Sequence, residues 1–394
     1  MISPDKITTD IELSPPGADA AAHSQRLCAL IADRIKQNGG QTGFDEFMHM
    51  ALYQPGLGYY VSGMRKFGQA GDFITAPEMG DLFGRCIARQ CHQVLNITGG
   101  DILEFGAGSG ALAVQILREL SRLHCLPEHY LILEVSPDLR QRQQEIIARE
   151  IPECADKVIW IDSLPEQFKG VMVANEVLDA MPVIRFRVGE QGWEEMKVVS
   201  EGAGFTGHYV SLTQEPDSFY TKEPDSLQLA TGYESEINHH AIAWTNTVAQ
   251  CLHKGVILLV DYGFPRNEFY HPDRAQGTLM CHYQHRAHTN PFVNVGLQDI
   301  TAHVDFSALA QAATDAGIDI LGYTQQAAFL MSLGILELVD VESSDTTHHL
   351  TQTNQIKKLT MPSEMGELFK VMALGRGIEE PLQGFAMSDR RARL

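Results

Sequence analysis

Three glycines and one carboxylate stand close together in the stretch DILEFGAGSGAL, residues 101–112. Gly106, Gly108 and Gly110 follow a short apolar segment and precede an apolar helical pattern, so a ligand can approach the backbone of this turn. Glu104 lies inside the apolar segment, where an unpaired carboxylate is costly unless it faces a ligand. It would repel a diphosphate and attract an ammonium or sulfonium group. The stretch therefore favours S-adenosylmethionine, which carries both cations, over a dinucleotide.

Two further acids follow the next two apolar segments. Glu134 ends YLILEV, where a carboxylate binds ribose hydroxyls, although NAD would require the same group. Asp162 follows KVIWI with Ser163 beside it, a position suited to a hydrogen bond with an adenine amino group. Each acid alone is more simply explained as a helix cap or a solvated loop residue. Three acids after successive strands, beside a glycine turn, predict an S-adenosylmethionine site.

Polar side chains also follow the fourth apolar segment, in ANEVLDAMP. Methyl transfer is an in-line displacement, so the protein mainly aligns the nucleophile and accepts its proton. Asn175 can position a polar nucleophile, and Glu176 can pair with a cationic one. If a helix starts here, Asp179 shares a face with Glu176, and two carboxylates suit a planar guanidinium. A helix start capped by Asn175, without a chemical role, is the alternative.

Two other stretches bear on the same cleft. GDFITAPE places Asp72, Thr75 and Glu78 in a loop that could cover a cofactor, and LVDYG ends the fifth apolar segment with Asp261 and Tyr262.

Histidines and acids near residues 281–306 have simpler explanations. CHYQHRAH, with His282, His285 and His288, matches no closed tetrahedral metal site, so we predict no metal and assign these histidines to a solvated loop. Asp299, His303 and Asp305 suit helix capping and loop hydrogen bonds.

Composition narrows the class of protein. The 394 residues carry a net charge of −20, which disfavours a nucleic-acid groove and permits a cationic substrate, although solubility alone explains such a charge. The apolar runs are too short to span a bilayer. The seven cysteines include no CxxC pair, and the first twenty residues resemble neither a signal peptide nor a transit sequence. We therefore expect a cytoplasmic protein.

The elements that position these residues form an α/β pattern. From about residue 100, short apolar runs alternate with helical segments, which predicts a parallel sheet with helices on both faces and ligands at the carboxyl ends of its strands. Residues 183 to about 225 alternate as antiparallel strands, which indicates an insertion after the fourth strand. Helices are predicted at 21–37 and within 43–60, where Pro55-Gly56 stops the second helix.

Several motifs, in this order, resemble the MidA family of class I S-adenosylmethionine-dependent methyltransferases. The resemblance covers nearly the whole chain after its first twenty residues and rests on the motifs GFDEFMHMALYQPGLGYY, GDFITAPEMGDLFG, LEFGAGSG, NEVLDAMP, LVDYG, GTLMCHYQHRAHTNPF and DITAHVDF. It implies a Rossmann-like class I methyltransferase sheet with a helical N-terminal segment and a β-rich insertion. It also implies protein arginine methylation, since the family's mitochondrial member acts on an arginine of a complex I subunit.

The resemblance also implies a division of roles. Glu104 and the three glycines would line the methionine end of the cofactor, Glu134 would hold the ribose and Asp162 the adenine. Asn175 and Glu176 would face the acceptor, while Asp72 and Thr75 belong to the family's cofactor-covering loop.

The predicted organisation follows from these assignments. It comprises a flexible arm at 1–20, a helical and glycine-rich segment at 21–98, a methyltransferase core at 99–182 and 255–394, and an insertion at 183–254 that forms part of the substrate cleft.

We predict an S-adenosylmethionine-dependent methyltransferase that acts on a protein arginine. The expected partner is a protein substrate such as a respiratory-complex subunit, with no nucleic acid and no membrane span. The oligomeric state stays open, with a homodimer among the alternatives. A small-molecule methyltransferase and an assembly or binding protein that retains the cofactor site also stay open, whereas Glu104 and the glycine spacing disfavour an NAD-dependent oxidoreductase.

Overall fold

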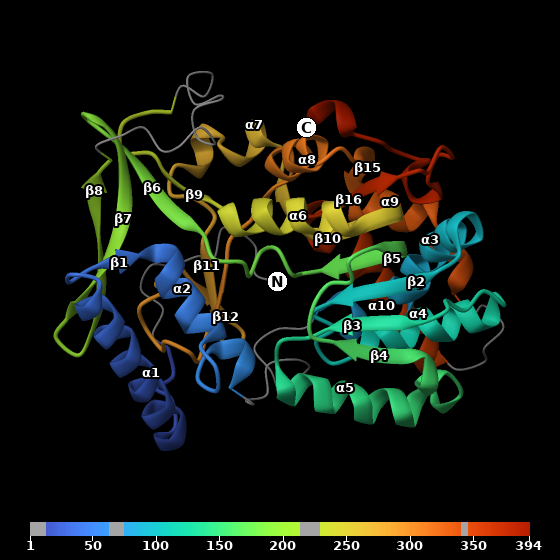
Figure 1. Ribbon diagram of the computed structural model, residues 1–394, viewed down its shortest axis with the longest axis horizontal. Helices are drawn as coiled ribbons and strands as arrows, with labels where there is room; N and C mark the ends of the chain where they lie inside the picture. Colours follow the sequence, from blue (N-terminus) through green and yellow to red (C-terminus); the bar gives the residue numbers. More distant parts are fainter. Residues whose placement is uncertain (1–12, 63–74, 213–228, 340–345) are drawn as a thin grey trace.

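The computed structural model of this chain describes residues 13–62, 75–212, 229–339 and 346–394. Asp72 lies outside these residues, so its predicted role stays a prediction. Figure 1 shows a large sheet on the right of the molecule and a smaller sheet, with helices α1 and α2, on the left.

The large sheet has eight strands. Its order is β15-β16-β10-β5-β2-β3-β4, with the short β14 paired to β10. The strands are β2 (Asp101–Phe105), β3 (Tyr130–Leu133), β4 (Val158–Ile161), β5 (Phe168–Asn175), β10 (Leu252–Phe264), β14 (Val304–Asp305), β15 (Asp319–Gln325) and β16 (Phe369–Arg376).

Five neighbouring strands of this sheet, from β4 to β10, run parallel, as the alternating pattern predicts. Strand β16 is antiparallel to both of its neighbours, β10 and β15. The sheet is therefore mixed and not wholly parallel. The difference arises because β16 follows β15 through helices that return the chain to the same end of the sheet.

Helices cover both faces of the large sheet. One face carries α3 (Leu82–Thr98), α4 (Ala111–Arg122), α5 (Pro137–Glu150), α9 (Gln326–Ser332), α10 (Thr346–Thr360) and α11 (Met365–Leu368). The other face carries α6 (His239–Cys251) and α8 (Phe306–Asp315). The α/β fold class predicted from the sequence is confirmed.

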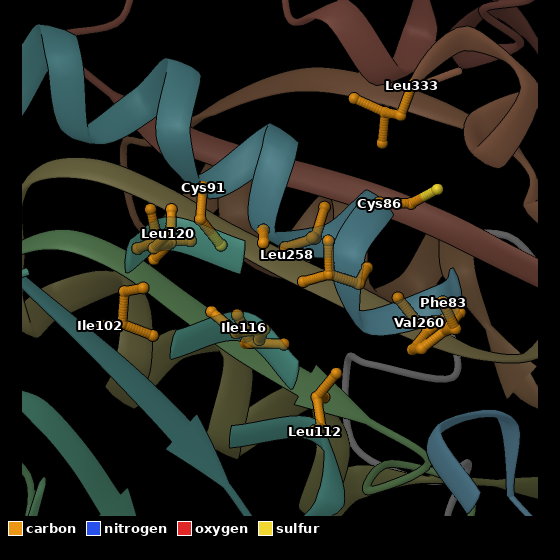
Figure 2. Close-up of a cluster of buried hydrophobic side chains, with 14 of the residues drawn as sticks. Phe83, Cys86, Cys91, Ile102, Leu112, Ile116, Leu120, Leu258, Val260 and Leu333 are labelled. Atoms are coloured by element: carbon orange, nitrogen blue, oxygen red, sulfur yellow. The ribbon is translucent and has the colours of Figure 1, made fainter. Parts of the chain in front are cut away.

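The larger apolar core lies between the sheet and helices α3 and α4. Figure 2 shows Phe83 and Cys91 of α3 and Leu112 and Ile116 of α4 in one cluster with Val260 of β10. All five side chains are buried. Because burial of each such side chain stabilises the fold by about 1.5–3 kcal/mol, this core holds the strand ends in fixed positions.

A second sheet lies beside the first. Its path is β1-β7-β6-β9, with β8 paired to β7. The strands are β1 (Thr42–Gly43), β6 (Ile184–Gly189), β7 (Gly192–Glu201), β8 (Gly204–Ser211) and β9 (Glu234–Ile237). Strands β6 to β8 confirm the antiparallel pattern predicted after residue 183.

Helices α1 (Ala18–Gln37) and α2 (Phe44–Tyr53) pack on this second sheet. The helix predicted within 43–60 is confirmed, and it ends before Pro55-Gly56 as predicted. It stops at Tyr53 because Pro55-Gly56 forms a turn, and Tyr59–Val61 form a single 3-10 turn.

The histidine-rich segment forms strands, which corrects its assignment to a solvated loop. It contributes β11 (Met280–Tyr283) and β12 (Arg286–His288), which form a small sheet with β13 (Asp299–Thr301). His288 lies in β12 and is buried, whereas His285 lies in the turn between β11 and β12 and is exposed. The short helix α7 (Arg266–Phe269) follows β10. No helix within the described ranges is long and apolar enough to cross a bilayer.

Candidate functional site

A cavity of ≈1910 Å³ lies at the carboxyl ends of β2, β3, β5 and β10. Tyr53, Tyr60, His282 and Asp299 line it from α2, the following turn and the small three-stranded sheet. Ligands bind at this edge of open α/β sheets. The cavity therefore lies between the large sheet and the module built from α1, α2 and the smaller sheets.

The glycine turn forms one wall of the cavity. Gly106, Gly108 and Gly110 have φ angles of +59°, +53° and +83°, a backbone region that favours glycine. Gly106 and Gly108 line the cavity, whereas Gly110 does not. A Cβ atom on Gly110 would lie 2.9 Å from Cγ2 of Ile146. The first two glycines expose backbone to a ligand, and the third permits close packing of α4 on α5.

Glu104 lines the cavity although it is almost completely buried. Its carboxylate accepts a hydrogen bond of 2.7 Å from the Tyr130 hydroxyl. Burial raises the pKa of Glu104 to about 7, although the hydrogen bond from Tyr130 lowers it. A neighbouring ammonium or sulfonium group would favour the ionised carboxylate, because an opposite charge lowers the pKa of an acid.

Glu134 is held at the cavity by its neighbours. Its carboxylate accepts hydrogen bonds from the Ser136 amide and from Nε2 of Gln143, both of 2.9 Å. Nε2 of Gln143 also donates to the Gly108 carbonyl at 3.0 Å, and Oε1 accepts from Trp160 Nε1 at 2.9 Å. Gln143 thereby connects the glycine turn, the end of β3 and strand β4.

Gln143 was not among the site residues predicted from the sequence. The signal was a polar residue on the buried face of α5, since Leu139, Gln143 and Ile147 are spaced by four residues and all are buried.

The remaining predicted cofactor residues differ in placement. Thr75 lines the cavity and precedes a 3-10 turn, Ala76–Met79. Asp162 and Ser163 are exposed and are not among the lining residues. The Asp162 side chain is 87% exposed and forms an ion pair of 2.7 Å with Arg140. The predicted adenine contacts of Asp162 and Ser163 stay predictions.

The segment after β5 forms a turn and not a helix, so Glu176 and Asp179 do not share a helix face. Glu176 has a left-handed backbone with φ +53°. Asp261 holds this turn, because its Oδ2 accepts hydrogen bonds from the amides of Leu178 (2.9 Å) and Asp179 (3.3 Å). The amides of Leu178 and Asp179 therefore donate to Asp261 and not to carbonyls of a preceding helical turn.

Three carboxylates line the cavity beside this turn: Glu176, Asp179 and Asp299. Asp179 is 5% exposed and Asp299 is 3% exposed. Burial, followed by the charge of Asp261, raises the pKa of Glu176 to about 8 and the pKa of Asp179 well above its usual range. A cation bound among these carboxylates would reverse the penalty, since it favours their ionised forms.

Asn175 completes this group. Its Nδ2 donates to Glu176 Oε1 at 3.2 Å. Oδ1 of Asn175 and Oδ1 of Asp179 are buried and have no hydrogen-bond partner within the described chain. Buried polar atoms are normally paired, so these two acceptors fit a ligand that brings N–H donors. We call Asn175, Glu176, Asp179 and Asp299 the acidic group.

Two tyrosines that sequence analysis missed cover the acidic group. Tyr60 Oη donates to Asp299 Oδ1 at 2.8 Å, and Tyr53 Oη donates to the Ala180 carbonyl at 3.0 Å. Their rings stack with centroids 5.5 Å apart. Only the fold brings these tyrosines to the turn after β5, more than a hundred residues away, so no local pattern reveals the contact.

Asp299, His303 and Asp305 have separate roles. Asp305 caps α8 as predicted, because its Oδ1 accepts from the amides of Ser307 and Ala308. Asp299 and His303 instead line the cavity.

The cavity walls fit S-adenosylmethionine. The glycine turn leaves room beside the backbone, and Glu104 presents a carboxylate for a cation at that turn. Glu134 stands at the end of the next strand with both carboxylate oxygens oriented by hydrogen bonds. The acidic group stands on the neighbouring side, at the end of β5.

A solved structure with high similarity carries the product of this cofactor. It is a likely methyl transferase from Burkholderia thailandensis bound to S-adenosyl-homocysteine, with 43% sequence identity and a TM-score of 0.94. The match covers 97% of this chain and 100% of that chain. A native crystal structure of an uncharacterised protein from the same organism matches over the same shares, with 43% identity and a TM-score of 0.90.

Curated relatives are also similar over most of their length. The zebrafish protein arginine methyltransferase NDUFAF7, mitochondrial, is 29% identical over 366 residues, which cover 85% of this chain and 83% of the relative. The human protein of the same name is 27% identical over 378 residues, or 86% and 81%.

The names of these relatives correct our expectation of location. They are mitochondrial proteins by name, which contradicts the cytoplasmic location predicted for this chain. The expectation was wrong because it rested on negative features, the lack of a CxxC pair and of a recognisable targeting pattern.

The model of one protein family matches residues 86–324, which include the glycine turn, the acidic group and strands β2 to β10. The family is described as putative S-adenosyl-L-methionine-dependent methyltransferase. The chain belongs to this family and is an S-adenosyl-L-methionine-dependent methyltransferase.

Proposed function

We propose that this enzyme methylates an arginine side chain of a protein. The observation that carries the proposal is the acidic group, in which Glu176, Asp179 and Asp299 line one cavity with the glycine turn. A guanidinium is planar and permanently charged, and it donates two parallel hydrogen bonds to a carboxylate. The curated relatives named above are protein arginine methyltransferases by name, which supports the same acceptor.

The acidic group would bind and orient the guanidinium. Asn175 Oδ1 and Asp179 Oδ1 are buried acceptors, so they suit two of its N–H donors. Tyr60 fixes Asp299 through its hydrogen bond, and Asp261 fixes the turn that carries Asp179. Orientation of the nucleophile is the main contribution that a protein makes to an in-line displacement.

Glu176 would accept the proton that the guanidinium loses. Bound S-adenosylmethionine supplies a methyl carbon that is activated by a positively charged sulfur. As the guanidinium nitrogen bonds to that carbon, the carbon–sulfur bond breaks and the nitrogen becomes acidic. The Glu176 carboxylate takes this proton, and its pKa of about 8 in the free protein makes it a stronger base than an exposed glutamate.

The cofactor would lie along the glycine turn. We assign Glu104 to the methionine end together with Gly106 and Gly108, and Gly110 to the packing that supports the turn. We assign Glu134 to the ribose hydroxyls. We assign Asp162 and Ser163 to the adenine. We assign Asp72 and Thr75 to the loop that covers the cofactor.

The partner is a protein substrate, and the resemblance to the MidA family makes a respiratory-complex subunit the first candidate. The oligomeric state stays open, with a homodimer among the alternatives.

The test uses purified protein with radioactive S-adenosylmethionine and an extract of cells that lack this enzyme. We expect label in the protein fraction and methylarginine in mass spectra of the labelled band. Label only in small molecules, or on another side chain, would contradict the arginine assignment.

A binding control accompanies this experiment. S-adenosylhomocysteine should stabilise the protein by about 2.7 kcal/mol at one hundred times its dissociation constant, whereas NAD should not. This control distinguishes an inactive preparation from a wrong acceptor.

A further inference from the structure

Three cationic side chains line the same cavity on the side of β16 and β10. They are Arg274, Lys370 and Arg390, and together with His303 and Tyr323 we call them the basic group. Two of the cations lie against the ring of Phe264. The Arg274 guanidinium carbon is 3.8 Å from the ring centroid and Lys370 Nζ is 5.0 Å from it.

His303 adjoins the same ring, and Arg390 adjoins Tyr323. The rings of His303 and Phe264 have centroids 5.3 Å apart. The Arg390 amide donates to the Tyr323 carbonyl at 2.6 Å, which places Arg390 beside Tyr323. Five polar side chains from five separate segments therefore line the cavity wall.

The cations of the basic group form no close ion pairs among the described residues, although the carboxylates of Glu268 and Glu367 line the same part of the cavity. Across the described ranges, Arg274, Lys370 and Arg390 form no ion pair within 4.0 Å. Lys370 is 6% exposed and donates instead to the carbonyls of Glu367 (2.5 Å) and Leu368 (3.1 Å). Arg274 donates to the carbonyl of Glu268, whose carboxylate is paired with Arg393 at 3.0 Å.

The neutral members of the basic group also have unused polar atoms. Tyr323 Oη and His303 Nδ1 are buried and have no hydrogen-bond partner in the part of the chain that the structure describes. Burial lowers the pKa of Lys370 to about 8 and of His303 to about 4. Lys370 is buried and contacts carbonyls but no carboxylate of the described residues, while Arg274 and Arg390 are half-buried, so this arrangement suits an anion that comes from outside the chain.

The strand order sets the distance between the basic group and the acidic group. Asn175 of β5 is paired with Val260 of β10, and the next residue of β10, Asp261, is paired with Lys370 of β16. Two strand spacings separate the backbones of β5 and β16, so these backbones lie about 10 Å apart. An extended peptide spans this distance in about three residues.

We propose that the basic group binds a carboxylate of the protein substrate within about four residues of the methylated arginine. This inference rests on the proposed function, because only a peptide with its arginine in the acidic group holds a neighbouring carboxylate within reach of the basic group. A protein with net charge −20 repels acidic peptides in general, so the basic group would select those whose carboxylate reaches it.

The test uses synthetic peptides that contain one arginine. One series places a glutamate at each of about four positions on either side of the arginine, and the matched series places glutamine there. A third series has no side-chain carboxylate and carries a free or an amidated C-terminus, which distinguishes the two sources of a carboxylate. Binding is measured by fluorescence anisotropy on protein saturated with S-adenosylhomocysteine.

We expect one glutamate position to improve the dissociation constant about tenfold over glutamine, as a charge-assisted hydrogen bond does. Arg390→Gln should remove this preference. Arg390 is partly exposed, so this variant should fold, and retained binding of S-adenosylhomocysteine verifies that it does. Arg149→Gln, an exposed arginine of α5 outside the cavity, should keep the preference.

The same peptides separate the two proposals. Equal binding of glutamate and glutamine peptides, or binding of neither, overturns the carboxylate site. Methylation of arginine in those peptides, measured separately, tests the proposed function. A preference for glutamate without any arginine methylation would keep the carboxylate site and overturn the arginine acceptor.

Discussion

The sides of the cavity that we propose for the cofactor and for the acceptor, called the cofactor side and the acceptor side, are built in different ways. The cofactor side uses Glu104, the glycine turn, Glu134 and Gln143, all within residues 104–143. The acceptor side joins Tyr53 and Tyr60 of the N-terminal region to Glu176, Asp179 and Asp299. One side is local in sequence, and the other exists only because two modules pack together.

The two sides also differ in electrostatics. The carboxylates of Glu104 and Glu134 accept hydrogen bonds from side chains or amides of the same sheet region. On the acceptor side, the carboxylates face one another, and this repulsion adds to burial in raising the pKa of Asp179. The cofactor side is prearranged for one known ligand, whereas the acceptor side requires a cation before all its carboxylates can ionise.

The largest effect is expected for Glu176→Gln on the acceptor side. Loss of a proton acceptor should lower kcat/KM for arginine peptides by about 10²-fold or more. In the unmodified enzyme, kcat/KM should rise with pH through about 8, because only the ionised carboxylate pairs with guanidinium. The measurement is a pH profile of initial rates for both proteins.

Two results check this expectation. Glu379→Gln, which changes an exposed glutamate in the same way, should retain both the rate and the pH profile. A flat profile for the unmodified enzyme between about pH 6 and about pH 9 would contradict the role of Glu176.

Glu104→Gln should change stability and cofactor binding in opposite directions. The folded pKa of Glu104, about 7, lies above the unfolded value of 4.5, so the folded state retains a proton that the unfolded state loses. Between these values stability falls as pH rises, by at most about 3 kcal/mol, and it stays lower above pH 7. Because glutamine carries no charge, the variant should be more stable than the unmodified protein above pH 7 but equally stable at low pH.

Cofactor binding supplies the other half of this test. S-adenosylhomocysteine should bind Glu104→Gln more weakly, because the carboxylate that faces its ammonium group is gone. Urea denaturation at two pH values, together with calorimetric titration, measures both effects. Unchanged affinity would show that Glu104 does not face the bound ligand.

The cofactor side could be predicted because its signals are local. A strand, a glycine turn and a helix start occupy twelve residues, and the acid inside the strand has no stable place in an apolar core. The parallel direction of β2 to β5 follows from the alternation of strands and helices. The antiparallel β16 could not be predicted in this way, because an apolar run does not specify its direction.

The acceptor side could be predicted only in part. Asn175, Glu176 and Asp179 were identified because they follow a strand, but the helix considered there is a turn. Asp261 causes this difference through hydrogen bonds that join residues more than eighty positions apart. Such bonds depend on the pairing of β5 with β10, which a local pattern does not contain.

Gln143→Ala tests whether the cofactor side depends on its buried support. The change removes the partner of the Gly108 carbonyl, Glu134 and Trp160, so stability should fall by about 2 kcal/mol. The dissociation constant of S-adenosylhomocysteine should rise about tenfold, because Glu134 loses its orientation. Gln141→Ala, on the exposed face of the same helix, should change neither quantity. Equal effects of Gln143→Ala and Gln141→Ala would show that both effects come from a general disturbance of helix α5 and not from the loss of the Gln143 hydrogen bonds.

Tyr60→Phe should have the smallest effect, and it tests whether packing between the two modules shapes the acceptor side. The change removes one hydrogen bond to Asp299 and keeps the ring that stacks on Tyr53. The expected loss is about 1 kcal/mol, which appears as a rise of about fivefold in KM for arginine peptides with little change in kcat. Tyr270→Phe removes a hydrogen bond from a tyrosine to the Glu236 carbonyl, and neither residue lines the cavity, so it should leave KM unchanged. If Tyr60→Phe instead lowers S-adenosylhomocysteine affinity, then the two sides of the cavity are coupled, and the N-terminal region supports the cofactor as well as the acceptor.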